Sequence, residues 1–126
     1  MAIISGLAST SLDCPDPVKL QQFYLQLTGW KTAWESADFI LISPDGSPYN
    51  GLGFQRVHEG YRAPDWPAQQ VPQQMHLDFF AADLDLAQQK AVEIGARVHE
   101  HQPCPDRWRV LLDPAGHPFC LCVEPE

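Results

Sequence analysis

The chain has 126 residues, of which 44% are hydrophobic and 19% charged, and its formal net charge is −8. This composition is typical of a soluble globular protein that forms one compact domain or two small halves sharing a core. The acidic balance argues against nucleic-acid binding, because the sequence has no cluster of lysines and arginines. No apolar run is long enough to cross a bilayer, and no leader-like start is present, so a cytoplasmic protein is expected. The four cysteines lack C-x-x-C spacing and are expected to stay reduced.

The first half of the chain, residues 1–57, alternates strand and helix patterns. Asp16 is a good helix cap, and Gly29 is a good helix end. Hydrophobic periodicity predicts a helix at 17–28 and strands at 3–14, 30–34, 39–43 and 52–57. Residues 58–73 form a proline-punctuated connection, which is long enough to be a linker or a functional lid.

The second half, residues 74–126, repeats this order. Asp83 opens its helix as Asp16 opens the first, and Gly95 ends it as Gly29 does. The same patterns predict a helix at 84–94 and strands at 75–82, 97–101, 108–112 and 119–123. Two βαβββ modules follow from this repeat, and together they form an α+β fold with a cupped mixed sheet.

Several motifs in this order resemble the vicinal oxygen chelate superfamily, which contains glyoxalase I, bleomycin-resistance proteins and extradiol dioxygenases. The resemblance rests on Thr28-Gly29-Trp30, the Pro44-Asp45-Gly46 turn, His76-Leu77-Asp78-Phe79 and Asp113-Pro114-Ala115-Gly116. It covers nearly the whole chain and looks closest to the small glyoxalase-like proteins. It implies a cup that holds a small-molecule ligand or a metal, and association into a homodimer.

The resemblance also implies a divalent-metal site, with one ligand from the first strand and one from the last strand of each module. In the second module these positions fall on His76 and Cys120. In the first module they fall on Ser9 and on either Asn50 or Leu52. A hard six-coordinate ion prefers imidazole and carboxylate ligands, so only His76 suits it. We therefore expect no bound metal and no other cofactor.

His76 is the candidate for chemistry, as a ligand contact, a general base or a hydrogen-bond donor; the alternative is an idle histidine that lines a cavity. Asp78 shares its strand face and could orient His76, meet a cationic ligand or lie exposed in solvent. Cys120 could pair with His76, although a small buried thiol is the more common role of a free cysteine. His99 and His101 share a strand face but lack a third ligand, so they are expected to be solvated.

Aromatic side chains indicate a binding cavity more strongly than the polar ones. Aromatic walls bind flat or cationic ligands, and Trp66 lies in a loop, where core packing does not explain it. Core packing is expected instead for Trp30, Phe39 and Phe119. The complete set of candidate cavity residues is Ser9, Trp34, Phe54, Trp66, His76, Asp78, Trp108 and Cys120.

Two functions are compatible with these patterns. The first is a metal-free protein that binds a planar or cationic small molecule, favoured by the acidic charge, the depleted ligand set and the aromatic loop. The alternative is an enzyme of the lyase, isomerase or dioxygenase type that uses His76 with nonstandard ligands. The sequence leaves open the identity of the ligand and whether the modules pair within one chain or between two.

Overall fold

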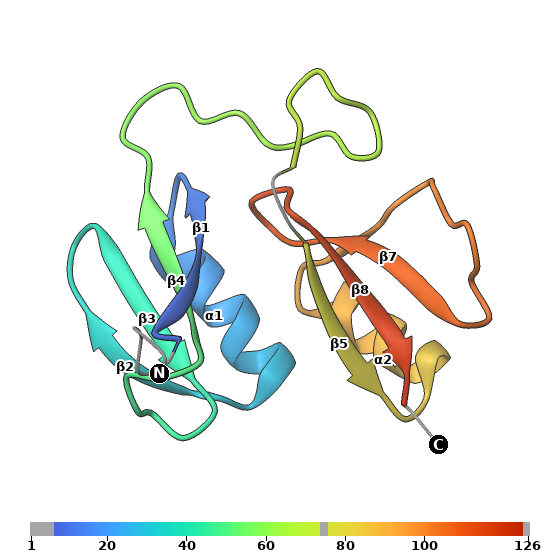
Figure 1. Cartoon of the computed structure of the whole chain (residues 1–126), viewed down its shortest axis with the longest axis horizontal. Helices are drawn as coiled ribbons and strands as arrows, with labels where there is room; N and C mark the ends of the chain where they lie inside the picture. Colours follow the sequence, from blue (N-terminus) through green and yellow to red (C-terminus); the bar gives the residue numbers. More distant parts are fainter. Residues whose placement is uncertain (1–6, 74–75, 125–126) are drawn as a thin grey trace, which may run out of the picture. The chain divides into compact units, whose positions relative to one another are not determined.

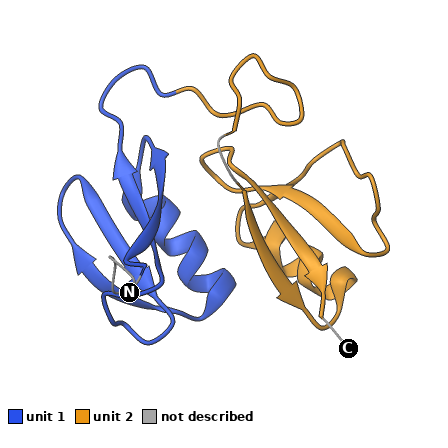
Figure 2. Ribbon diagram, in the orientation of Figure 1, with its two compact units in different colours: residues 1–61 blue, residues 62–126 orange. Residues whose placement is uncertain are grey.

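The computed structural model describes residues 7–73 and 76–124, which contain two four-stranded mixed sheets and two helices (Figure 1). The chain divides into two compact units, Met1–Tyr61 and Arg62–Glu126 (Figure 2). The division falls inside the expected connection 58–73. The predicted α+β fold of two βαβββ modules is confirmed. Neither of the two helices in the described part of the chain is long and apolar enough to cross a membrane.

The first unit has the strand order β1-β4-β3-β2, with β1 and β4 parallel and the other pairs antiparallel. Its helix begins after Asp16, whose carboxylate accepts a hydrogen bond from the Lys19 N–H, and it ends at Gly29, where φ is 72°. The elements are β1 (Ser9–Cys14), α1 (Pro17–Thr28), β2 (Lys31–Glu35), β3 (Phe39–Ser43) and β4 (Gly51–Arg56).

The second unit repeats this topology with the order β5-β8-β7-β6, in which β5 and β8 are parallel. Asp83 caps its helix by accepting a hydrogen bond from the Leu86 N–H, as the repeat predicts. The elements are β5 (Leu77–Ala81), α2 (Leu84–Glu93), β6 (Arg97–Val98), β7 (Trp108–Leu112) and β8 (Pro118–Val123).

The predicted element boundaries differ from the observed ones at three strands: β1 begins only at Ser9, β5 begins only at Leu77 and so excludes His76, and β6 is shorter than expected. The strand expected at 97–101 ends at Val98, because the chain turns there and the His101 N–H donates to Nδ1 of His99. Residues 3–6 and 75, at the start of two expected strands, lie outside the described residues. Both helices were predicted to within one residue at each end.

The core of the first unit lies between α1 and one face of its sheet. Tyr24 of α1 stacks on Phe54 of β4 with ring centroids 5.5 Å apart and an interplanar angle of 10°. Phe54 has no exposed surface, so it belongs to this core rather than to a cavity wall, contrary to expectation. Other buried side chains on this side of the sheet are Leu12, Leu20, Phe23, Ile40 and Ile42.

The core of the second unit lies between α2 and the corresponding face of its sheet. Phe119 is fully buried, as predicted, and packs edge-to-face against Phe79 at 6.1 Å. Trp30 and Phe39 of the first unit, which were also expected in a core, are only half-buried. The buried carboxylate of Asp113 accepts hydrogen bonds from the N–H groups of Ala115 and His117, which closes the turn between β7 and β8.

Replacing Phe54 by Ala should lower the free energy of unfolding by about 3–5 kcal/mol, because it removes a fully buried aromatic ring and its stacking on Tyr24. Replacing Trp34, which is 60% exposed, should change this free energy by about 0.5 kcal/mol or less. Urea unfolding of the two variants measures both values. Equal losses would contradict this assignment of the core.

Candidate functional site

The parallel strand pairs β1–β4 and β5–β8 correspond to each other in the two units, so their registers identify equivalent residues. Asp78 of β5 pairs with Cys120 of β8. Asp78 lies five residues before the helix cap Asp83, as Ser11 lies five before Asp16. Ser11 pairs with Gly53 of β4, so Gly53 is the counterpart of Cys120. The sequence had left Asn50 and Leu52 as alternatives for this position, and the pairing selects neither.

The first unit offers few donors at the positions where the resemblance implies metal ligands. Gly53 has no side chain, and a Cβ built there would lie 2.5 Å from the Phe39 ring and 2.8 Å from Oγ of Ser11. Leu52 is buried, and the Asn50 N–H donates to the carbonyl of Leu7. Ser9 supplies only a hydroxyl. This donor set does not fit a hard six-coordinate ion, which needs imidazole and carboxylate.

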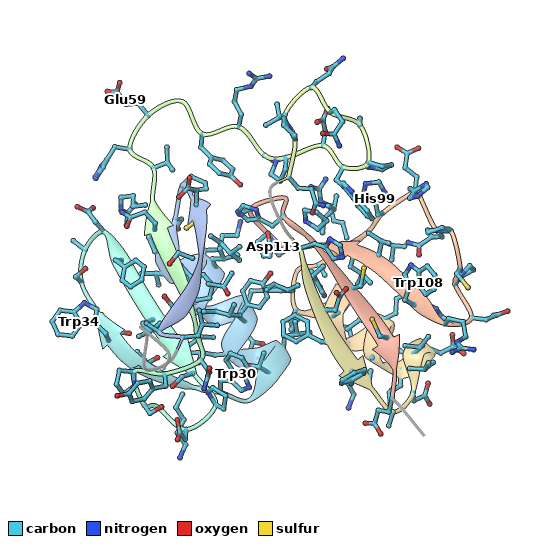
Figure 3. All side chains as sticks on the ribbon, viewed as in Figure 1. Trp30, Trp34, Glu59, His99, Trp108 and Asp113 are labelled. Atoms are coloured by element: carbon cyan, nitrogen blue, oxygen red, sulfur yellow. The ribbon has the colours of Figure 1, made fainter. Side chains whose placement is uncertain are left out.

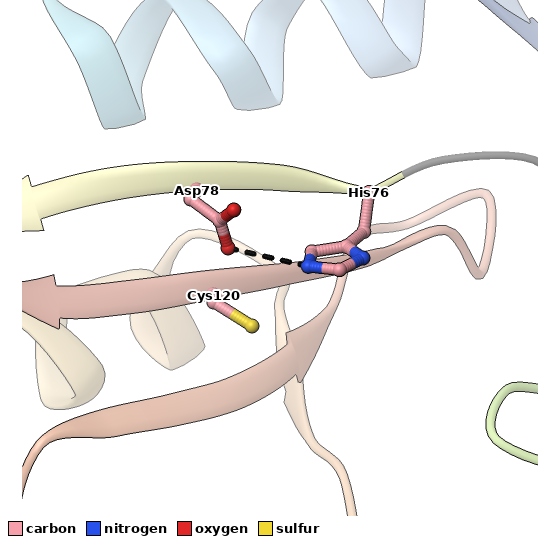
Figure 4. Close-up of side chains that lie close together, drawn as sticks. All are labelled: His76, Asp78 and Cys120. Carbon is pink, nitrogen blue, oxygen red and sulfur yellow. Dashed lines mark ion pairs between the residues drawn. The ribbon is translucent and has the colours of Figure 1, made fainter.

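The second unit brings three of the predicted site residues together (Figure 4). His76 directly precedes β5, and Asp78 and Cys120 are cross-strand neighbours, so their side chains project from the same face of the sheet. Nε2 of His76 lies 3.4 Å from Oδ1 of Asp78. One imidazole nitrogen, one carboxylate oxygen and the thiol sulfur all lie within 4.8 Å of one another.

Both ring nitrogens of His76 have polar neighbours. Nε2 of Gln73 lies 3.4 Å from Nδ1, and an amide can only donate through this nitrogen. In the neutral tautomer that accepts this hydrogen bond, Nε2 carries the proton and faces Asp78. These two contacts orient the imidazole ring.

The thiol of Cys120 is held in its protonated form. Burial, the negative charge and hydrogen bond of Asp78, and the neighbouring Cys122 raise the pKa of Cys120 to about 12. Burial and Asp78 also raise the pKa of Cys122. Because the thiolate is the reactive form, Cys120 is not poised as a nucleophile at neutral pH. This matches the interpretation of Cys120 as a small buried thiol.

A cleft of about 630 Å³ lies on this face of the sheet, and five of the predicted cavity residues line it. These are Trp66, His76, Asp78, Trp108 and Cys120. The Trp66 and His76 rings are 5.3 Å apart, tilted by 31°. Five further residues line this cleft, and the sequence analysis did not predict them: His101, Pro103, Arg107, Cys122 and Val123.

The remaining predicted cavity residues do not line this cleft. Ser9 and Trp34 belong to the first unit, where Ser9 is half-buried on β1 and Trp34 points from β2 into solvent (Figure 3). Phe54 lies in the core of that unit. Strand alternation explains its position, because Phe54 and Gly53 are successive residues of β4 and face opposite sides of the sheet.

Gln102 organises the loop that carries His99 and His101, and sequence reasoning missed it. Its side-chain amide donates to the carbonyls of His99 and Val110, at 2.8 and 2.7 Å, and accepts from the Val110 N–H at 3.0 Å. These bonds attach the loop to β7. His101 then meets Trp66 edge-to-face with ring centroids 6.1 Å apart. A glutamine in a proline-rich loop carries no sequence signal for such a role.

Comparison with known proteins agrees with the fold and the resemblance. Residues 9–122 match the model of the glyoxalase-like domain family. The chain therefore belongs to the glyoxalase-like family, within the vicinal oxygen chelate superfamily. No curated protein matches the sequence.

Solved structures with the same fold include proteins of different kinds. A glyoxalase-related enzyme from Fulvimarina pelagi has a TM-score of 0.69 at 16% identity, over 97% of this chain and 90% of that one. The fosfomycin resistance protein FosX from Mesorhizobium loti has a TM-score of 0.68 at 14% identity, covering 98% and 94%. The bleomycin-binding protein of Streptomyces verticillus, in complex with copper(II)-bleomycin, has a TM-score of 0.60 at 16% identity, covering 99% and 100%.

The pH midpoint for alkylation of Cys120 by iodoacetamide should lie well above the ordinary value for cysteine, because burial and Asp78 raise the pKa of this thiol to about 12. Replacing Asp78 by Asn should move this midpoint to lower pH, because the variant removes a negative charge and a hydrogen bond that favour the protonated thiol. Burial remains, so the midpoint should stay above the ordinary value for cysteine.

Peptide mass spectrometry of the modified protein measures this midpoint separately for each cysteine. The exposed Asp106, which does not line the cleft, provides the matched control, and Asp106→Asn should leave the profile unchanged. A midpoint near pH 8 in the unmodified sequence would contradict the environment described for Cys120.

Proposed function

We propose that this protein is a metal-free binding protein for a planar small molecule that carries a cationic group. The observation that carries the proposal is the cleft of the second unit, where Trp66, Trp108 and Asp78 line one space. Its volume of about 630 Å³ suits a small organic ligand.

The two tryptophans supply flat apolar surface for a planar ligand. Trp108 is 38% exposed, although it lies on a strand, so part of its ring is available to a bound molecule. Trp66 comes from the connecting loop and packs against His76, which holds its ring in the cleft wall. Each aromatic contact contributes roughly 0.5–1.5 kcal/mol beyond area burial, so the two rings act together.

Asp78 supplies the negative charge for a cationic group. More than half of its side chain is exposed (58%), although Nε2 of His76 lies close to its carboxylate. Arg107 lines the same cleft, so a cation is favoured at the Asp78 end and disfavoured near Arg107. The formal net charge of −8 adds a long-range attraction for cations that weakens as salt rises.

The donor set supports binding without a metal. The first unit presents Ser9 and Gly53 where the superfamily resemblance implies ligands, and the second unit presents a protonated thiol beside His76. The bleomycin-binding protein from Streptomyces verticillus has the same fold and is named for binding rather than catalysis. Association into a homodimer and a cytoplasmic location stay predictions from the sequence, and sedimentation of the purified protein tests the first.

An enzyme is the second candidate, and one observation favours it. His76, Asp78 and Cys120 place three possible metal-ligating atoms within 4.8 Å of one another. Imidazole, carboxylate and thiolate can together hold zinc, provided that the thiol loses its proton on binding. Metal analysis separates the two candidates, because only the enzyme needs a bound ion.

The protein purified without chelator should contain less than one equivalent of zinc, nickel, manganese or iron, and adding each ion should leave its melting temperature unchanged. A tight site would raise the free energy of unfolding by about 3–4 kcal/mol at a hundredfold to thousandfold excess over Kd, an effect that is easily measured. Elemental analysis and thermal melts provide the readouts. One equivalent of metal, lost in His76→Ala, would refute the metal-free proposal in favour of the enzyme.

Replacing Trp108 by Ala should weaken the binding of planar cations by about 2- to 10-fold, because one stacking surface is lost. Trp34→Ala is the matched control, since Trp34 is exposed on the other unit and should leave binding unchanged. A screen of planar cations and aromatic antibiotics, followed by tryptophan fluorescence quenching, measures these affinities. If no compound binds, or if both variants lose affinity equally, the cleft is not the binding site.

A further inference from the structure

A second cleft adjoins the first, and the proposed function does not use it. Its volume is about 520 Å³, and it is lined by two short segments, residues 65–68 and 99–101. Two of its residues, Trp66 and His101, also line the first cleft. These two side chains therefore form a shared aromatic ridge that borders both clefts.

The ridge consists of the Trp66 and His101 rings, which meet edge-to-face at an interplanar angle of 89°. His76 packs against Trp66 and lines only the first cleft, whereas Asp65 and Pro67 flank Trp66 in sequence and line only the second. The indole thus contributes surface to both spaces. A planar group that crosses this ridge keeps aromatic contact along its length.

Hydrogen bonds hold both segments of the second cleft in place. The Asp65 N–H donates to the Val71 carbonyl at 2.8 Å, and the Val71 N–H donates to the Asp65 carboxylate at 2.7 Å. On the other segment, the His101 N–H donates to Nδ1 of His99 at 2.9 Å, and Gln102 attaches the loop to β7. A preformed wall of this kind lowers the ordering cost of binding.

The two clefts differ in charge. Asp65 and Glu100 line the second cleft, and neither lysine nor arginine is among its described lining residues. In the first cleft, Arg107 faces the same space as Asp78. One carboxylate oxygen of Asp65 already accepts from Val71, so the exposed Glu100 is the main anionic group open to a ligand. A cationic group that enters the second cleft meets no opposing Lys or Arg.

We propose that the two clefts form one elongated groove, which binds a long ligand with two cationic ends. Its planar part lies between Trp108 and Trp66 in the first cleft, and its far end crosses the ridge to Glu100 in the second. This inference rests on the proposed function, because it requires the first cleft to bind the planar part.

Two fluorescence or dialysis titrations of the full chain test the groove. Diamidino-phenylindole is a long planar dication, and benzamidine is a short planar monocation that fits within one cleft. Glu100→Gln should weaken binding of the long probe by about 2- to 5-fold and leave benzamidine binding unchanged, because only the long probe reaches the second cleft. Trp66→Ala should weaken binding of the long probe, since it removes the shared ridge.

Glu93→Gln is the matched control, because Glu93 lies on α2 and lines neither cleft. Thermal melts check that each variant is folded.

If Trp108→Ala weakens binding of the long probe but Glu100→Gln does not, the second cleft is unused and the proposed function stands. If benzamidine binds and the long probe does not, the clefts are not continuous. If neither probe binds at millimolar concentration, the inference is wrong, and the Trp108 screen alone decides the proposed function.

Discussion

The parallel pairing of β5 with β8 is the constraint on which the site depends. It places Asp78 directly beside Cys120, and strand alternation sends both side chains to the face opposite α2. The apolar residues next to them in sequence, Phe79 and Phe119, therefore face the helix and pack against each other in the core. A shift of one residue would exchange the two sets and bury a carboxylate against α2. The packing of the core and the geometry of the site therefore both depend on this register.

The two modules repeat this pairing but use it differently. In the first unit the equivalent pair is Ser11 and Gly53, and the Phe39 ring lies against the glycine. In the second unit the pair is Asp78 and Cys120, which leaves a polar cluster beside an open cleft. A glycine permits close approach of a ring to the backbone, whereas two polar side chains leave groups that can contact a ligand. Both halves share the fold, but among the residues that the structure describes a polar cluster of this kind lies only in the second half.

The surroundings of the cluster limit the reactivity of its thiol. Burial and Asp78 keep the Cys120 thiol protonated, and Gln73 and Asp78 lie beside the two nitrogens of His76. A thiol whose proton is held in this way is a poor nucleophile, and the two neighbours of His76 fix the orientation of its ring. The aromatic rings beside them, Trp66 and Trp108, add apolar surface without adding reactivity.

The sequence by itself determined the local elements and the order of the fold. Caps at Asp16 and Asp83 and the hydrophobic periodicity predicted both helices. Alternation predicted that the side chains of His76 and Asp78 lie together, although His76 precedes β5 and is not part of the strand. These features depend on neighbours within one or two turns of chain. Tertiary structure alone decided the partner of each strand residue, which selected Gly53 over Asn50 and Leu52 and placed Phe54 in the core. It also decided how the Gln102 loop attaches to β7 and how Trp66 meets His101, because these contacts join residues of different segments, where periodicity carries no information.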